Sequence, residues 1–210
     1  MKSFTLVPSV DRLLSGAVAA AKRFPLALVC ASIGAIGAVI MTEYRNVDKP
    51  SELTNLVATL FLGLPLFITL TLAAENRNWS KRATVVVQAI GLIVLAVYFI
   101  SLPRDLFHPT GSIIRHAILA FGVHFLVAIG PFFMKGVARG FWQYNKSLLL
   151  GLLTSAFYSA ALFLGLTIAL AAADYLFGIH VKPDTYGELW ILMAGIVNTW
   201  IFLALVPKDL

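Results

Sequence analysis

The stretch 84-TVVVQAIGLIVLAVYFISL-102 decides the class of fold. Its 19 residues include no charged side chain, and about 20 apolar residues in a helix cross the roughly 30 Å hydrocarbon core of a bilayer. A strand that crosses a membrane alternates apolar and polar residues, whereas this stretch does not. It therefore predicts a membrane-spanning helix, which satisfies its own backbone hydrogen bonds in lipid.

The chain holds five more apolar stretches of similar length. They cover residues 24–42, 56–74, 113–134, 148–173 and 189–206. The composition agrees, because 60% of the residues are hydrophobic and 12% are charged, against about a quarter charged in a soluble domain. We expect an all-α, six-helix transmembrane domain over residues 24–210, preceded by a cytoplasmic segment over residues 1–23.

The positive charges predict the orientation of this domain. Eleven Lys and Arg residues fall on the side that holds both termini, and five fall on the other side. The excess marks the cytoplasmic face, so both termini are expected in the cytoplasm. In the first segment, apolar residues from Val10 to Ala21 recur at helical spacing after Ser9, a typical N-cap residue. They predict a short amphipathic helix on the cytoplasmic surface.

Small residues recur every four positions in the fifth stretch and predict close helix packing. One set is Ala161, Gly165, Ala169 and Ala173, and a second set on another face is Gly151, Ser155 and Ser159.

Three polar residues fall near the middle of their stretches, where ionisable and strongly polar groups are the first place to look for function. They are His124, Tyr158 and Asn198. One hypothesis is a site around His124 that binds a solute or relays a proton. The other, which we favour, is a hydrogen-bonded contact that holds three helices in register.

At the outer rim, Arg115 begins the fourth stretch and Asp174 ends the fifth, which predicts an ion pair between the two helices. The chain contains no zinc-protease, nucleophile-elbow or phosphate-loop motif. The histidine spacing fits no metal-ligand pattern, and the single cysteine, Cys30, excludes an internal disulfide. We therefore assign no catalytic residue, no cofactor and no metal.

The stretch 138-ARGFWQYNKS-147 lies between the fourth and fifth apolar stretches. Aromatic and basic residues are typical of the membrane interface, where rings lie among headgroups and cations meet anionic lipids. We predict a short cytoplasmic turn that anchors the chain to the surface, and a nucleic-acid site is disfavoured because the turn is short. The anchor residues are Arg139, Phe141, Trp142, Tyr144 and Lys146.

The segments 141-FWQYNKSL-148, 165-GLTIALAAADYLFGI-179 and 189-LWILMAGIVNTWIFLALVP-207, with 23-RFPLAL-28, resemble a bacterial integral membrane family. It is called domain of unknown function 4153 (DUF4153). The resemblance implies a bacterial inner-membrane protein and adds no catalytic residue. Members of the family continue into further membrane segments beyond the equivalent of Pro207, so the resemblance implies a short member or the N-terminal half of one.

We expect a non-catalytic membrane module in envelope physiology, which assembles with itself or with other membrane proteins. The expected partners also include membrane lipids with anionic headgroups. The alternative is a transporter or channel component with a polar site around His124, and a lipid-active enzyme has the least support. A continuous polar path to His124 would favour transport, and a dry interior lined by small residues would favour the module.

Overall fold

The computed structural model of the protein describes residues 10–44, 51–104, 106, 110–132 and 138–207, with the side chains of residues 10–15, 138 and 139 left out. Every element in this part of the chain is a helix, and six helical segments are long and apolar enough to span a membrane. The all-α, six-span prediction is confirmed. The helices are α1 (Val10–Arg23), α2 (Pro25–Glu43), α3 (Ser51–Asn76), α4 (Lys81–Ser101), α5 (Thr110–Ile129), α6 (Ala138–Phe177), α7 (Pro183–Leu192) and α8 (Asn198–Leu205).

Local chemistry explains where several helices begin and end. Helices α2 and α7 have Pro25 and Pro183 in their first turns, where a missing N–H costs nothing. Helix α4 is capped by Ser80, whose Oγ accepts a hydrogen bond from the Ala83 N–H at 3.2 Å. Helix α6 is followed by Gly178 at φ 61°, a left-handed conformation that glycine adopts without strain.

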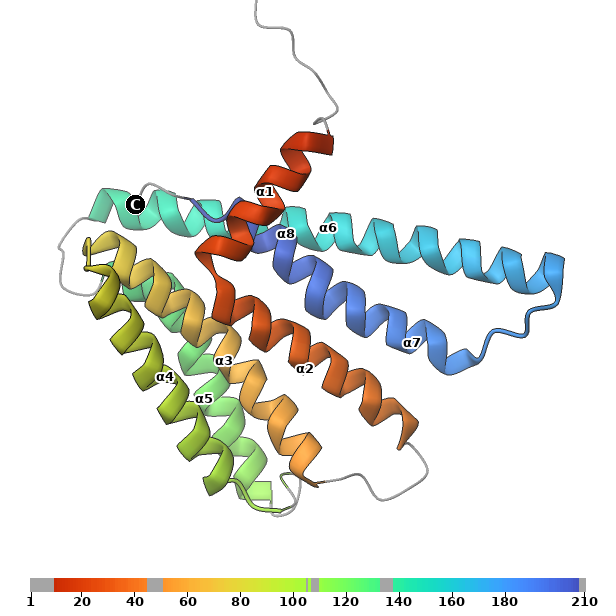
Figure 1. Ribbon diagram of the computed structural model, residues 1–210, viewed down its shortest axis with the longest axis horizontal. Helices are drawn as coiled ribbons and strands as arrows, with labels where there is room; N and C mark the ends of the chain where they lie inside the picture. The colour runs from red at the N-terminus through yellow and green to blue at the C-terminus, as the bar shows by residue number, and fades with distance from the viewer. Residues whose placement is uncertain (1–9, 45–50, 105, 107–109, 133–137, 208–210) are drawn as a thin grey trace, which may run out of the picture.

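Helix α2 lies between two groups of helices (Figure 1). On one side, α3 packs against α2, α4 and α5. On the other side, α6 packs along the last span, in which a π-helical turn at Met193–Val197 joins α7 to α8. Helix α1 crosses α8, and the Trp200 Nε1–H donates a hydrogen bond to the Ala17 carbonyl at 2.9 Å. Ser9, the expected cap of α1, lies outside the described residues.

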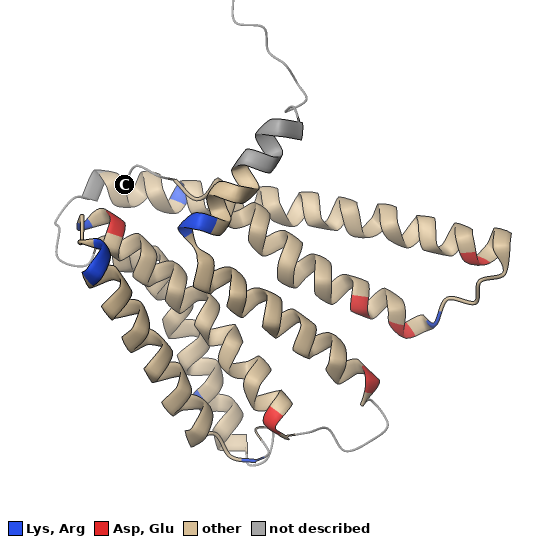
Figure 2. Cartoon of the chain, viewed as in Figure 1, with Lys and Arg blue, Asp and Glu red and all other residues tan. Residues whose placement is uncertain are grey.

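The tightest packing lies at the end of the bundle where α1 meets α2. Phe24 and Leu72 are 0% exposed and Leu203 is 1% exposed. Most of the basic residues lie at this end, and most of the acidic residues lie toward the opposite end, as Figure 2 shows. The helices therefore meet at the basic end.

Helix α6 is longer than the sequence predicts. Its 40 residues correspond to about 60 Å, twice the thickness of a hydrocarbon core. It begins ten residues before the expected start at residue 148, so 138–147 is helix rather than a turn. Within this first part, Asn145 Nδ2 and Ser147 Oγ donate hydrogen bonds to the carbonyls of Phe141 and Gln143, four residues earlier.

The two sets of small residues in α6 have different surroundings. Gly151, Ser155 and Ser159 are buried, and a Cβ placed at Gly151 would meet Leu205 at 3.5 Å and Phe202 at 3.8 Å. This set forms the contact with the last span. A Cβ placed at Gly165 would meet no atom within 4 Å. The second set, Ala161, Gly165, Ala169 and Ala173, is exposed or only partly buried.

Candidate functional site

A cavity of about 970 Å³ lies between the two groups of helices. Helices α2, α3, α5, α6 and the last span all contribute to its walls. Its lining contains no Asp, Glu, Lys or Arg residue and is dominated by aliphatic and aromatic side chains. The polar lining side chains are His124, Asn145, Asn198 and Thr199.

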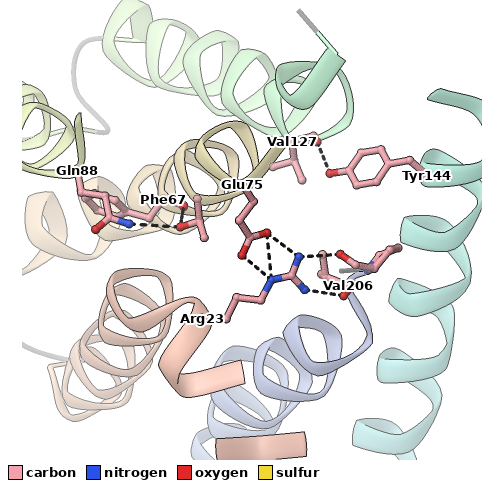
Figure 3. Close-up of polar contacts among 9 residues, drawn as sticks. Arg23, Phe67, Glu75, Gln88, Val127, Tyr144 and Val206 are labelled. Atoms are coloured by element: carbon pink, nitrogen blue, oxygen red, sulfur yellow. Dashed lines mark hydrogen bonds and ion pairs between the residues drawn. The ribbon is translucent and has the colours of Figure 1, made fainter. Parts of the chain in front are cut away.

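The cavity lining reaches the point where α5 meets α6, at Val127, Ala128 and Asn145. The Tyr144 hydroxyl donates a hydrogen bond to the Val127 carbonyl at 2.8 Å (Figure 3). Next to it, Asn145 Nδ2 lies 3.3 Å from the Ala128 carbonyl. The Phe132 ring packs against the Tyr144 ring with a centroid distance of 5.3 Å. From this junction α5 and α6 diverge (Figure 1), and the cavity occupies the space between them.

The open side of the cavity faces outward between α5 and α6. The lining residues Phe121 and Phe125 of α5 are 71% and 64% exposed, and Leu149 of α6 is 57% exposed. All three lie within membrane-spanning segments. In a bilayer, this opening faces lipid hydrocarbon.

Small residues form the back wall. Helix α2 contributes Ala31, Gly34, Ala35 and Ala38 to the lining. The π-helical turn meets α2 at Gly195, where an added Cβ would lie 2.8 Å from the Ala35 Cβ. This close approach fixes the last span against α2.

His124 lines the cavity from α5. Its Nδ1 lies 2.7 Å from the Ala120 carbonyl oxygen, and because a carbonyl only accepts hydrogen bonds, Nδ1 carries the proton. In a neutral imidazole, Nε2 is then a hydrogen-bond acceptor. The ring lies 5.4 Å from the Phe61 ring, centroid to centroid.

Asn198 lines the cavity from the opposite side, directly after the π-helical turn. Its Oδ1 is buried and has no hydrogen-bond partner among the described residues. Eight positions separate His124 from the end of its span at Phe132, and seven separate Asn198 from Leu205. At about 1.5 Å per residue, both lie about 11 to 12 Å from the basic end of the bundle.

Tyr158 does not join these two residues. It is 55% exposed, lies outside the cavity lining and packs against Phe157 at a centroid distance of 6.0 Å. Ser155 and Ser159 face the last span instead, so Tyr158 occupies a different face of α6. Of the predicted cluster, the structure brings only His124 and Asn198 to one cavity.

Arg115 and Asp174 do not form the predicted ion pair in the described part of the chain. Arg115 Nε donates a hydrogen bond to the Gly111 carbonyl at 3.2 Å, and Asp174 Oδ1 accepts one from the Val181 N–H at 3.2 Å. Each charged group thus bonds within its own segment. The expected pairing fails because α5 and α6 diverge toward this end (Figure 1).

The predicted interfacial anchor divides into exposed and buried residues. Trp142 is 71% exposed and Phe141 is 37% exposed, and Lys146 is also exposed. Tyr144 is only 3% exposed, so its ring packs between α5 and α6 rather than among headgroups. The side chain of Arg139 lies outside the described residues.

A charged contact that the sequence analysis did not identify joins three parts of the chain. Arg23, the last residue of α1, donates two short hydrogen bonds to Glu75, from Nε at 2.9 Å and from Nη2 at 2.8 Å (Figure 3). It also donates to the carbonyls of Val206 at 2.8 Å and Pro207 at 2.7 Å. The signal in the sequence is Glu75, a carboxylate in a segment otherwise rich in cations, beside Arg77, Lys81 and Arg82.

Comparisons of the chain with protein-family models, with curated proteins and with solved structures find no match.

Proposed function

We propose that this multi-span membrane protein is a non-catalytic module that holds the apolar chain of a membrane lipid or a similar amphiphile between α5 and α6. The observation that supports the proposal is the cavity of about 970 Å³, lined almost entirely by apolar side chains and open between two spanning helices. Ligand pockets of about 300 to 1,000 Å³, with apolar walls and a few placed polar groups, are typical of small-molecule sites.

The membrane environment favours this occupant. The solvent at the open side is hydrocarbon, so a lipid chain reaches the cavity without crossing a polar region. A chain inside gains van der Waals contacts with the walls, and each contact is small but their sum is large. Small residues on α2, such as Gly34 and Ala38, leave room for the chain.

The same lining disfavours the alternative of an ion or polar-solute pathway through His124. Pathways of that kind are lined by rings of carbonyls or charged side chains, whereas the polar groups here are few and the charged residues lie at the ends of the helices (Figure 2). The apolar lining, with small residues on α2, favours the module.

The placement of charge supports the rest of the proposal, which includes both termini in the cytoplasm of a bacterial inner membrane and contact with anionic headgroups. Among the described residues, Lys22 and Arg23 lie in the last turn of α1, and Lys81 and Arg82 begin α4. Figure 2 shows basic segments gathered at this end of the bundle, and such an excess marks a cytoplasmic face. Membership in the DUF4153 family remains a prediction. The exposed face around Gly165 offers a contact surface for a second copy or another membrane protein.

The experiment that tests the proposal fills the cavity. Phosphatidylcholine with a photoreactive diazirine in one acyl chain is added to the protein in lipid nanodiscs, and labelled residues are mapped by mass spectrometry. We expect label on wall residues such as Leu60 and Ala194. The variant Ala38→Phe should lower this label, because the larger side chain takes up part of the cavity.

The matched control is Ala161→Phe, which adds the same side chain at an exposed position of α6 outside the cavity lining. It should leave the wall label unchanged. Equal wall labelling in the wild type and in folded Ala38→Phe would count against the proposal.

A further inference from the structure

We infer that the lipid held in the cavity is an anionic phospholipid of the leaflet at the basic end of the bundle, and that Lys146 binds its headgroup. This lipid is the molecule whose chain the cavity holds, so the inference rests on the proposed function. The rim of the cavity, the depth of its lining and the charges at the basic end all support the assignment.

The charged headgroup of such a lipid stays outside the cavity. No Lys, Arg, Asp or Glu residue lines the walls, and burying an unpaired charge in an apolar environment is very unfavourable. Only the chain therefore enters, past the exposed lining residues Phe125 of α5 and Leu149 of α6. The residues that select the headgroup are those between this opening and the membrane surface.

One face of α6 leads from this opening toward the basic end. Residues Trp142, Lys146, Leu149 and Leu153 follow one another at spacings of four, three and four positions, so they lie on the same face of the helix. All four are exposed. At about 1.5 Å per residue, Lys146 lies about 4.5 Å closer to the basic end than Leu149. An ammonium group and an indole ring, both typical of the membrane interface, therefore lie next to the opening.

The depth of the cavity matches the chain of a lipid from this leaflet. Along the last span, the lining begins at Phe202, three positions before the end of the span at Leu205, and continues to Trp190. The distance from Phe202 to Trp190 is about 18 Å along the helix axis. One leaflet contributes about 15 Å of hydrocarbon, half of the roughly 30 Å core. A headgroup held at Lys146 therefore places its acyl chain along the lining, directed toward Trp190.

The ammonium group of Lys146 is available to an anion. In the part of the chain that the structure describes, the ion pair at the basic end joins Arg23 to Glu75, and no carboxylate lies within ion-pair distance of Lys146. Hydrogen bonds between an ammonium group and a phosphate are strong because both groups are charged. Phosphatidylglycerol has a net negative charge, whereas the choline of phosphatidylcholine brings a second cation close to Lys146. The anionic lipid is therefore the better match.

The test compares phosphatidylglycerol and phosphatidylcholine that have the same diazirine in the acyl chain. Each is added in trace amount to the protein in phosphatidylcholine nanodiscs, and the label on the wall residues Leu60 and Ala194 is divided by the label on Val94, an exposed residue of α4. This ratio corrects for a general enrichment of anionic lipid around a basic protein. In the wild type, phosphatidylglycerol should give a ratio about fivefold higher, which corresponds to about 1 kcal/mol for one cation beside anionic lipid.

The variant Lys146→Gln should abolish this preference and leave wall labelling by phosphatidylcholine unchanged, because glutamine keeps a polar side chain without the charge. The matched control is Lys81→Gln, which removes an exposed cation of α4, a helix that contributes no residue to the cavity lining. The control should retain the preference. A preference that persists in Lys146→Gln, or that is lost equally in Lys81→Gln, would overturn the inference.

The position of the diazirine along the acyl chain provides a second readout in the wild type. With the headgroup at Lys146, a diazirine next to the carboxyl ester should label Leu148 and Phe202, at the basic end of the lining. A diazirine at the methyl end should label Val57 and Ile191, at the other end of the lining. The reverse pattern would show that the chain enters from the acidic end, which would contradict the inference.

The outcomes separate the two proposals. Equal ratios for phosphatidylglycerol and phosphatidylcholine in the wild type, with wall labelling present, would overturn the assignment of the headgroup to Lys146 and leave the lipid-binding module standing. Absence of wall labelling by both lipids would overturn the proposed function itself, and the inference with it.

Discussion

Replacing Arg23 with alanine is expected to lower the free energy of unfolding by about 3 kcal/mol, because hydrogen bonds from a charged donor contribute about 1.5 to 3 kcal/mol each and several are lost together. The Arg23 side chain is 13% exposed and bonds Glu75, Val206 and Pro207 at once. Its loss leaves three chain segments at the basic end without their common contact. The measurement is SDS-induced unfolding in mixed micelles.

Two further variants refine this prediction. Glu75→Gln should cost only about 1 kcal/mol, because the Glu75 side chain is 37% exposed and exposed ion pairs contribute about that much or less. Arg82→Ala is the control, since Arg82 is an exposed cation at the same end of the bundle. If Arg23→Ala unfolded at the same SDS fraction as Arg82→Ala, the contact would have no structural importance.

The second large effect is expected from Gly195→Leu. A Cβ at this position would lie 2.8 Å from the Ala35 Cβ, well inside the roughly 3.5 to 4.0 Å at which two carbons make a favourable contact. The last span must then move away from α2, and overpacking of this kind costs about 1 to 3 kcal/mol. We expect a value near the top of that range, measured by the same SDS titration.

Gly165→Leu is the matched control in α6. A Cβ there meets no atom within 4 Å, and leucine favours a helix over glycine by up to about 1 kcal/mol, so this variant should unfold no more easily than the wild type. A loss of stability in Gly165→Leu as large as in Gly195→Leu would show that the difference between the two glycines has been misjudged.

The six spans could be predicted from the sequence because each is a run of apolar residues about as long as a bilayer core is thick. The start of α6 could not. Trp142, Lys146 and the amide side chains around them suggest a polar turn between two spans. In the structure, however, Asn145 and Ser147 donate hydrogen bonds to carbonyls four residues earlier within the helix. Polarity alone does not show whether a segment turns or continues as a helix.

The sequence gives the position of each candidate residue along its span, but not the direction in which its side chain faces. His124 and Asn198 reach one cavity from different helices. Tyr158 lies beyond the part of α6 that lines the cavity, Asn145 to Leu152, and Ser155 and Ser159 form the contact with the last span on another face.

The sequence also does not show how far apart two neighbouring helices lie in the plane of the membrane. Arg115 and Asp174 lie near the same end of neighbouring spans in the sequence, and only the divergence of α5 and α6 separates them (Figure 1). The two helices diverge from the junction at Tyr144 and Val127, a long-range contact that no local pattern indicates. The same divergence creates the cavity.

The central claim is that a lipid chain occupies the space between α5 and α6, and an experimental structure of the protein in a lipid nanodisc tests it most directly. The account predicts α5 and α6 diverging from the Tyr144 junction, with a continuous tube of density between them that reaches His124 and Asn198. Helices α5 and α6 packed side by side along their whole length, or a cavity filled by ordered water, would contradict it.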